Sequence, residues 1–334
     1  VTDGVTVAGN LSVDGGTIKL DGNYPTGTDN VALGDTALDS ETSGTRLTAV
    51  GSNALTAATS ANYSVAVGSN ALASATTATF NTAVGDYALQ AATGGSNTGI
   101  GAATLYSTTS GQYNTALGHS ALQSNTTASY NTSVGYQSGY SQTTGGNNTS
   151  FGATSLYSTT TGSLNTAIGQ SSLYSNTTGA NNTALGLQSL YSNTTASNNT
   201  AVGYQAGYSN TTGYNVAAFG NQALYSNTTG ALNTALGDSS LLANTTGSSN
   251  TAVGRSALNA NTTASNNTAV GASALTANTT GTQLTAIGHQ AGYTNTTGSF
   301  TAVGYRALYS NTTGNTGVAV GHDSLFANTD GADN

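Results

Sequence analysis

Large apolar residues recur along this chain at a nearly constant interval, each standing directly before a glycine. The step between successive glycines is 17 residues, but it is 16 from Gly85 to Gly101 and from Gly288 to Gly304. A fixed period of this length predicts stacked, identical supersecondary units. The glycines of this series are Gly34, Gly51, Gly68, Gly85, Gly101, Gly118, Gly135, Gly152, Gly169, Gly186, Gly203, Gly220, Gly237, Gly254, Gly271, Gly288, Gly304 and Gly321.

The stretch from Asn250 to Asn266, NTAVGRSALNANTTASN, serves as the reference unit, with Gly254 at position five. Position four is Val, Leu, Ile or Phe in every unit, and position nine is Leu in fifteen of the eighteen. Positions three, eight and eleven are always small, and position thirteen is always Thr. We expect positions four and nine to supply the core, while the small residues permit close packing.

A β-solenoid explains this unit better than a helix does. Each unit contains Gly, Thr and Asn, all of which are weak helix formers. The stretch NTAVG suits one short strand, the stretch around the repeated Ala-Leu suits a second, and Asn-Thr-Thr-Gly suits a turn. The predicted fold is therefore all-β, a parallel β-solenoid of about 18 coils that would form a rod of ~85 Å at ~4.8 Å per coil.

Stacking also predicts ladders of identical side chains along the axis. Position twelve is Asn in ten successive units, from Asn176 to Asn328, and position one is Asn in twelve units. Stacked Asn side chains can hydrogen-bond along the axis, and the Thr at position thirteen would form another ladder. We expect the glycine at position five to mark a bend that other residues cannot adopt, or a close approach of two backbones.

Two segments divide the chain. Residues 1–29 lie outside the repeat and are predicted to be an N-terminal β cap or connector, with short strands in VTVAGNLSV and GTIKL. Residues 30–334 form the repeat array. Seven of the twelve acids stand in residues 1–41, but their spacing matches no calcium-binding loop.

Composition excludes several classes of function. Only 5% of the residues are charged, and the chain contains no Cys, Met or Trp, which excludes disulfides and thiolate metal sites. Nucleic acid is not an expected partner, because phosphate binding needs clustered Lys and Arg. No apolar run approaches the ~18 residues of a membrane helix, so we expect no membrane insertion. The chain does not begin with Met or a signal peptide, which suggests a processed protein or a piece of a longer one.

The thin core predicts self-association. A single coil offers about two large apolar residues, and its first strand has no strongly polar face. A strand without a wet face is usually covered on both sides. Several chains packed lengthwise would cover one another, so we predict a homo-oligomer, and specifically a homotrimer.

The repeated A-[VIL]-G-x-x-[AS]-L of Ala83–Leu89, Ala235–Leu241 and Ala252–Leu258 resembles the YadA-like head repeats of trimeric autotransporter adhesins. The resemblance covers most of the chain and implies a homotrimer of left-handed parallel β-rolls. This unit is longer than the usual head repeat of about 14 residues, which we attribute to a larger Asn-Thr-Thr-Gly loop. The sequence shows neither the coiled-coil stalk nor the anchor barrel of an autotransporter.

The Asn-Thr-Thr-Gly stretches are also similar to bacteriophage tail-fibre proteins that carry such head repeats. This resemblance implies a structural protein of the virion that takes part in host attachment, joined to other tail proteins through its N-terminal segment. A bacterial surface adhesin head is the alternative, and an ice-binding β-solenoid is a further one. The Thr pairs of the presumed turn are adjacent rather than alternating, which disfavours ice binding.

No catalytic, cofactor-binding or metal-binding residues are predicted, and we expect no enzyme and no cofactor. The three histidines, His119, His289 and His322, share position six but fall in distant units, which is poor spacing for metal ligands. The Asn-x-Thr triplets, including Asn125, Asn176, Asn193 and Asn198, match glycosylation sites, but the predicted ladders explain them.

Tyrosines at position ten are the sharpest candidate for a binding stripe for host glycans or proteins, because Tyr combines apolar area with a hydroxyl. Packing at a chain–chain interface is the competing explanation. In three units Gly replaces the Leu of position nine before a Tyr, so the ring could fill the space that the Leu leaves. The candidate residues are Tyr140, Tyr157, Tyr174, Tyr191, Tyr208 and Tyr225.

Overall fold

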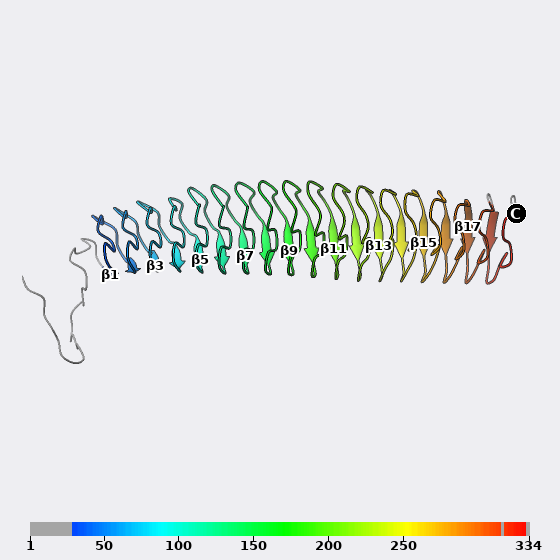
Figure 1. The fold of residues 1–334 in the computed structure, drawn as a ribbon, viewed down its shortest axis with the longest axis horizontal. Helices are drawn as coiled ribbons and strands as arrows, with labels where there is room; N and C mark the ends of the chain where they lie inside the picture. The colour runs from blue at the N-terminus through cyan, green and yellow to red at the C-terminus, as the bar shows by residue number, and fades with distance from the viewer. Residues whose placement is uncertain (1–28, 315–316, 332–334) are drawn as a thin grey trace, which may run out of the picture.

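The computed structural model describes residues 29–314 and 317–331, and the strands expected within residues 1–28 lie outside this range. Eighteen coils follow one another along a rod, and each carries one short strand (Figure 1). All the strands pair in parallel with those of the coils before and after, as when Thr251 of β14 (Thr251–Val253) pairs with Thr268 of β15 (Thr268–Val270). We number each coil after its strand. The array is thus a parallel β-solenoid with a 17-residue period, as predicted, and the described residues include no helix.

The remaining strands are equally short, with three or four residues each. They are β1 (Val31–Leu33), β2 (Thr48–Val50), β3 (Val65–Val67), β4 (Thr82–Val84), β5 (Thr98–Ile100), β6 (Thr115–Leu117), β7 (Thr132–Val134), β8 (Thr149–Phe151), β9 (Thr166–Ile168), β10 (Thr183–Leu185), β11 (Thr200–Val202), β12 (Ala217–Phe219), β13 (Thr234–Leu236), β16 (Thr285–Ile287), β17 (Phe300–Val303) and β18 (Gly317–Val320).

The prediction of a second strand in each coil is wrong. Positions six to eleven form a turn in which positions seven and nine adopt left-handed backbone conformations, with φ of 56° at Ser256 and 50° at Leu258. Such conformations break the extended path that a strand needs, and they are uncommon for residues other than glycine. The turn carries the Leu258 side chain into the core, where it is fully buried.

The core also differs from the prediction at position four. Ala252, at position three, is fully buried, whereas Val253, at position four, is only half-buried. Adjacent side chains of a strand point to opposite faces, and the narrow interior of the coil admits only the small residue of this pair. The core therefore consists of Ala and other small residues at positions three and eight, Leu at position nine, and buried Asn at positions one and twelve.

Both asparagine ladders are present, which confirms the prediction. At position twelve, Asn193 donates from Nδ2 to Oδ1 of Asn176 at 2.9 Å, and the next coils repeat this bond. At position one, the backbone N–H of Asn182 donates to Oδ1 of Asn165 at 3.0 Å. These bonds satisfy amide groups that would be costly to bury alone.

The threonines of position thirteen form the third predicted ladder, in which each hydroxyl donates to the carbonyl of the equivalent Thr one coil further on. Thr245 bonds Thr262 in this way at 3.0 Å. Both reasons given for the glycine at position five also hold. Gly254 has φ of +127°, and a Cβ there would lie 2.6 Å from the carbonyl carbon of Gly271.

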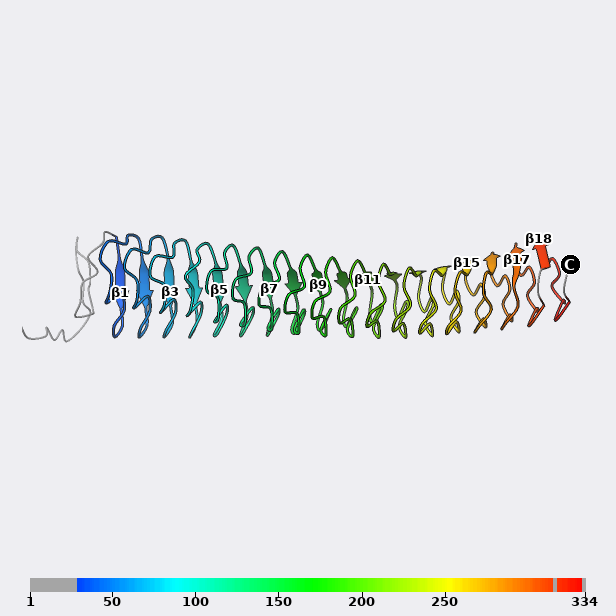
Figure 2. The same cartoon turned by 90° about the horizontal axis from the view of Figure 1, so that it is seen from above.

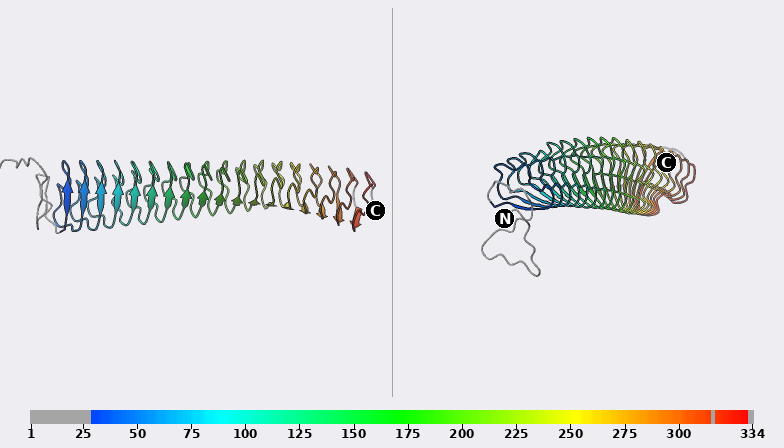
Figure 3. Two further views of the ribbon diagram at one scale, coloured as in Figure 1. Left: turned by 90° about the horizontal axis from the view of Figure 1, so that it is seen from below. Right: turned by 60° about the vertical axis from the view of Figure 1, so that its left-hand side comes forward.

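The coils stay in register where the period drops to 16 residues. Thr82 of β4 still pairs with Thr98 of β5, and Thr285 of β16 still pairs with Thr301 of β17. The missing residue therefore comes from the connection between strands rather than from the strands. Along the rod the strands turn gradually from face-on near β1, through edge-on in the C-terminal half, to the opposite direction near β18, so the sheet is twisted (Figures 2 and 3).

Candidate interaction surfaces

The outer face of the long sheet carries one continuous apolar row beside a row that is mostly Thr. We call the outward side chains of positions two and four the sheet face. Position four contributes Leu117, Phe151 and Leu236, which are 44%, 55% and 48% exposed. Position two contributes a parallel row that is mostly Thr. This pair of rows runs through all eighteen coils, so the sheet face is as long as the rod.

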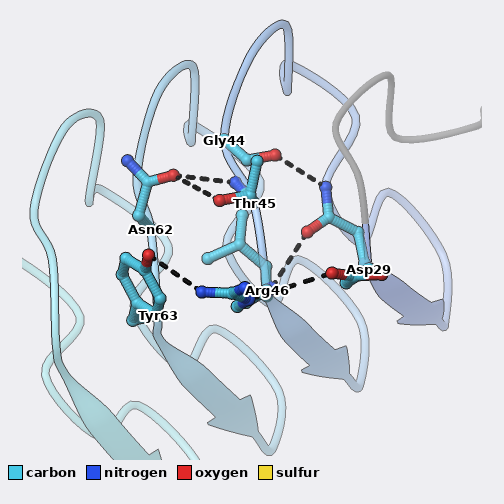
Figure 4. Close-up of polar contacts among 8 residues, drawn as sticks. Asp29, Gly44, Thr45, Arg46, Asn62 and Tyr63 are labelled. Carbon is cyan, nitrogen blue, oxygen red and sulfur yellow. Dashed lines mark hydrogen bonds and ion pairs between the residues drawn. The ribbon is translucent and has the colours of Figure 1, made fainter.

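Aromatic and charged residues at position seventeen flank the start of the strands. At the N-terminal end of the rod, Arg46 Nε lies 3.8 Å from a carboxylate oxygen of Asp29, and its Nη1 donates to the Tyr63 hydroxyl at 3.0 Å (Figure 4). The Tyr63 ring then stacks on Phe80 of the next coil with 5.0 Å between centroids. Tyr113 and Tyr130 form a second stack of this kind. The contacts follow from the repeat, which brings each side chain above its counterpart.

Position six flanks the other end of the strands and carries the three histidines. His119 stacks on Tyr136, and Tyr305 lies between His289 and His322 with centroid distances of 5.4 and 4.9 Å. Within the described residues, no group of three His, Cys, Asp or Glu side chains is placed to hold a metal ion. The histidines act here as planar rings in a stack.

The six tyrosines of position ten form one continuous stack, which we call the tyrosine ladder. Successive centroids lie 5.1 Å apart, and neighbouring rings are parallel within 8°. Each ring is half-buried. The backbone holds the rings in register, because the N–H of Ser175 donates to the Tyr191 carbonyl at 3.0 Å and the other coils repeat this bond. The structure thus brings all six candidate residues together.

The Tyr rings do not fill the space of the missing leucines, contrary to the expectation above. Gly139 has φ of +62°, and a Cβ there would lie 2.9 Å from the Leu122 Cδ2 atom of the preceding coil. Leu190 occupies the same place beside Gly207, and Leu275 and Phe300 crowd Gly292. Neighbouring core side chains therefore fill the gap, and each Tyr ring remains in its surface stack.

A row of polar side chains at position seven runs beside the tyrosine ladder. Two bonds elsewhere in the array show that these positions are neighbours. Asn259, at position ten, donates to the carbonyl of Ser239 at position seven, and Thr276 donates to that of Ser256. We call this part of position seven the polar row. Its members are Gln137, Thr154, Ser171, Gln188, Gln205 and Gln222.

Stacking changes the electrostatics of the ladder. Burial raises the pKa of the Tyr157 and Tyr208 hydroxyls, and the neighbouring tyrosines raise it further. A phenolate in the stack would lie close to the phenolates of neighbouring tyrosines, and this repulsion favours the neutral form. These two hydroxyls therefore stay protonated at neutral pH and can donate as well as accept hydrogen bonds.

The sequence predicted that both faces of the first strand are covered, but it placed position four in the core and so missed which residues form the sheet face. The useful signal was the invariably small residue at position three, which marks the inward side of a narrow coil. Strand alternation then places position four outside. The glycosylation triplets at Asn125, Asn176 and Asn193 are buried in the coil interior, whereas Asn198 lies exposed at position seventeen, outside both asparagine ladders.

Comparison with known proteins adds no relative. No protein-family model matches the chain, and no curated protein is recognisably similar to it in sequence. The resemblance to YadA-like head repeats therefore stays a prediction that rests on the repeated motif. Within the described ranges, no helix has the length and hydropathy of a membrane span.

Proposed function

We propose that this protein is a structural fibre of a virion, of the type found in bacteriophage tails, in which three copies pack lengthwise into a rigid rod for host attachment. The observation that carries this proposal is the sheet face, in which an exposed row of Val, Leu, Ile and Phe at position four continues through every coil beside a row that is mostly Thr. Exposed apolar patches of this extent mark interaction sites in soluble proteins. In the fibre, residues 1–29 connect the rod to other proteins of the particle.

A second and a third copy of this chain are the partners that fit the sheet face. The face repeats coil by coil with a gradual twist, so a partner with the same repeat, twist and length can cover all of it. Residues 42–322 carry two acids and three arginines, so charge repulsion between copies is weak. Copies in register would also place like residues opposite one another in every coil.

Three-fold packing fits the flanks of the sheet face. Apolar rings stand on both sides of it, with Phe80 and Tyr130 at position seventeen and Tyr136 and Tyr305 at position six. Each of these side chains is between 42% and 59% exposed. Two different neighbours, one on each flank, would cover both rows, which is the arrangement in a three-fold bundle.

Charge substitution on the sheet face tests the proposal. The triple variant Leu117→Asp, Leu185→Asp and Leu236→Asp introduces carboxylates into the interface, and we expect it to sediment as a monomer while the unaltered chain sediments as a trimer. The matched control changes the exposed loop residues of the same coils, Thr127→Asp, Thr195→Asp and Thr246→Asp, and should stay trimeric. A monomeric unaltered chain would refute the proposal.

The head of a bacterial trimeric adhesin would need the same rod, and imaging of the chain in its native assembly separates the two assignments. Ice binding is a second use of the sheet face, because position two is an outward Thr in fourteen of the eighteen coils. The twist of the sheet opposes it, since an ice plane is flat (Figure 2). Measurable thermal hysteresis of the purified chain would favour ice binding over the fibre.

A further inference from the structure

The tyrosine ladder differs from an ordinary aromatic binding platform. Because each ring stacks on the next at 5.1 Å, the ring faces inside the ladder are covered by other rings. Only the outward faces of Tyr140 and Tyr225 lie outside the stack. A ligand that approaches from the side therefore meets ring edges and hydroxyl groups, which carry partial positive charge and hydrogen-bonding capacity.

The hydroxyl groups of this surface are free to bond a ligand. Within residues 29–314 and 317–331, none of the six ladder hydroxyls forms a hydrogen bond with another side chain or with the backbone. The polar row beside the ladder adds amide groups that are already oriented. Gln205 donates to Gln188 at 3.0 Å and Gln222 donates to Gln205 at 3.1 Å, which leaves each donating amide a second N–H.

The surface is also organised in advance. The backbone bonds between coils fix the spacing of the rings, and Tyr has only two side-chain torsions to restrict. Binding therefore loses little conformational entropy. Since the same groups recur at every coil over six coils, the surface favours a ligand that also repeats along its length.

We propose that the tyrosine ladder and the polar row together bind an extended, neutral polysaccharide that lies parallel to the rod. Sugar hydroxyls bond the phenol and amide groups, and the repeat of the polymer follows the repeat of the coils. An anionic polymer is disfavoured, because coils 7–12 contain no Lys or Arg. The biological sense of this binding rests on the proposed attachment function, but the binding itself does not require three chains.

The test uses the whole chain and four solid polymers. We expect retention on cellulose and chitin, which are extended and neutral, and little retention on amylose, which is coiled, or on heparin-agarose, which is anionic. Replacing all six ladder tyrosines by Phe keeps the ring stack and removes the hydroxyls, and should weaken binding more than tenfold. The control is Tyr113→Phe with Tyr130→Phe, a stacked pair outside the ladder, which should bind as the unaltered chain does.

A second variant separates hydroxyl recognition from ring-face recognition. Tyr174→Ala with Tyr191→Ala opens the ladder and exposes two ring faces, so it should weaken binding if hydroxyls and edges are the site. Unchanged or stronger binding by this variant or by the Phe variant would overturn the inference, as would preference for heparin or no retention at all. Sedimentation of the same samples keeps the two proposals apart, because a monomer that binds refutes only the fibre, and a trimer that does not bind refutes only the ladder site.

Discussion

Asn227 donates a hydrogen bond from Nδ2 to Oδ1 of Asn210 in the preceding coil at 2.7 Å, and both side chains are fully buried. The same Nδ2 group also donates to the carbonyl of Gly230 at 2.9 Å. One amide thus joins two coils and closes its own turn. Because the bond repeats in successive coils, the stability of each coil depends on its neighbours, as in other repeat proteins.

Replacing Asn227 by Ala should destabilise the array by at least about 2 kcal/mol, because it leaves the Asn210 oxygen, an N–H of Asn244 and the Gly230 carbonyl without partners. Urea unfolding followed by circular dichroism measures the change. Thr229→Ala, at an exposed position of the same coil, should change the stability by less than ~0.5 kcal/mol. Equal effects of the two substitutions would show that the ladder contributes nothing.

Replacing Gly254 by Ala should be more damaging, with a cost of at least about 3 kcal/mol. The φ of +127° strains any other residue, and the new Cβ would lie 2.6 and 2.7 Å from the carbonyl carbon and oxygen of Gly271, which cannot rotate away. The control is Gly317→Ala at the start of β18, where an added Cβ would have no heavy atom within 4 Å among the described residues. Thermal unfolding of both variants measures the difference, and a well-tolerated Gly254→Ala would contradict the argument.

Coils 17 and 18 should be sensitive to acid. Arg306 donates two hydrogen bonds to Asp323, which lower the pKa of that carboxyl below its ordinary value. A carboxyl with a lowered folded pKa stabilises the fold above its unfolded pKa, and this contribution is lost as the pH falls through the folded value. Amide hydrogen exchange in these coils should therefore accelerate on acidification, and Asp323→Asn should remove most of this dependence. The effect should be small, because the pair is partly exposed.

The tyrosine ladder should give the opposite dependence at alkaline pH. Burial and neighbouring rings raise the pKa of Tyr157 and Tyr208 above the ordinary value of 10.0. A raised folded pKa means that the contribution to stability is complete below the unfolded pKa and is lost as the pH rises through the folded value. Phenolate absorbance should therefore appear at a higher pH for these two residues than for unfolded tyrosine. The variant with Phe at all six ladder positions should lose the alkaline destabilisation. Simultaneous ionisation of all tyrosines would contradict this.

The sequence predicts the solenoid because each position of the repeat shows the same residue type in many units, and each such position independently supports the same coil. The Asn of position twelve, the Thr of position thirteen and the glycine of position five each had a role that follows from stacking alone. Prediction failed where backbone geometry within one coil decides. The left-handed conformation of Leu258 makes a turn out of an apparently extended stretch, and composition gives no sign of it.

The candidate surfaces were predictable to a lesser degree. The recurrence of Tyr at position ten was visible in the sequence. That the rings cover one another's faces was not, because only the 5.1 Å centroid distance in the structure shows it. Position four was misplaced because size was taken as a sign of burial. In Ala252-Val253 the smaller residue is the buried one, since the width of the coil, rather than hydrophobicity, selects what points inward.

Removal of whole units should leave the fold intact and lengthen the ladder. Deleting residues 233–283 takes out three 17-residue units and joins Leu232 to Leu284, two residues that already hold successive positions of the repeat. Tyr225 and Tyr293 then fall in consecutive coils, so the stack should grow from six tyrosines to eight. Small-angle scattering should show a rod shorter by ~14 Å, because each coil contributes ~4.8 Å.

The out-of-phase control deletes residues 233–275, which removes two and a half units and sets outward positions against inward ones. This variant should lose its cooperative unfolding, because a shifted strand exposes its core side chains. The in-phase variant should also be retained more strongly on cellulose than the unaltered chain if the ladder is the binding surface. An in-phase variant that folds but binds no better would support the repeat as the basis of the fold. It would also show that the tyrosine ladder is not the binding surface.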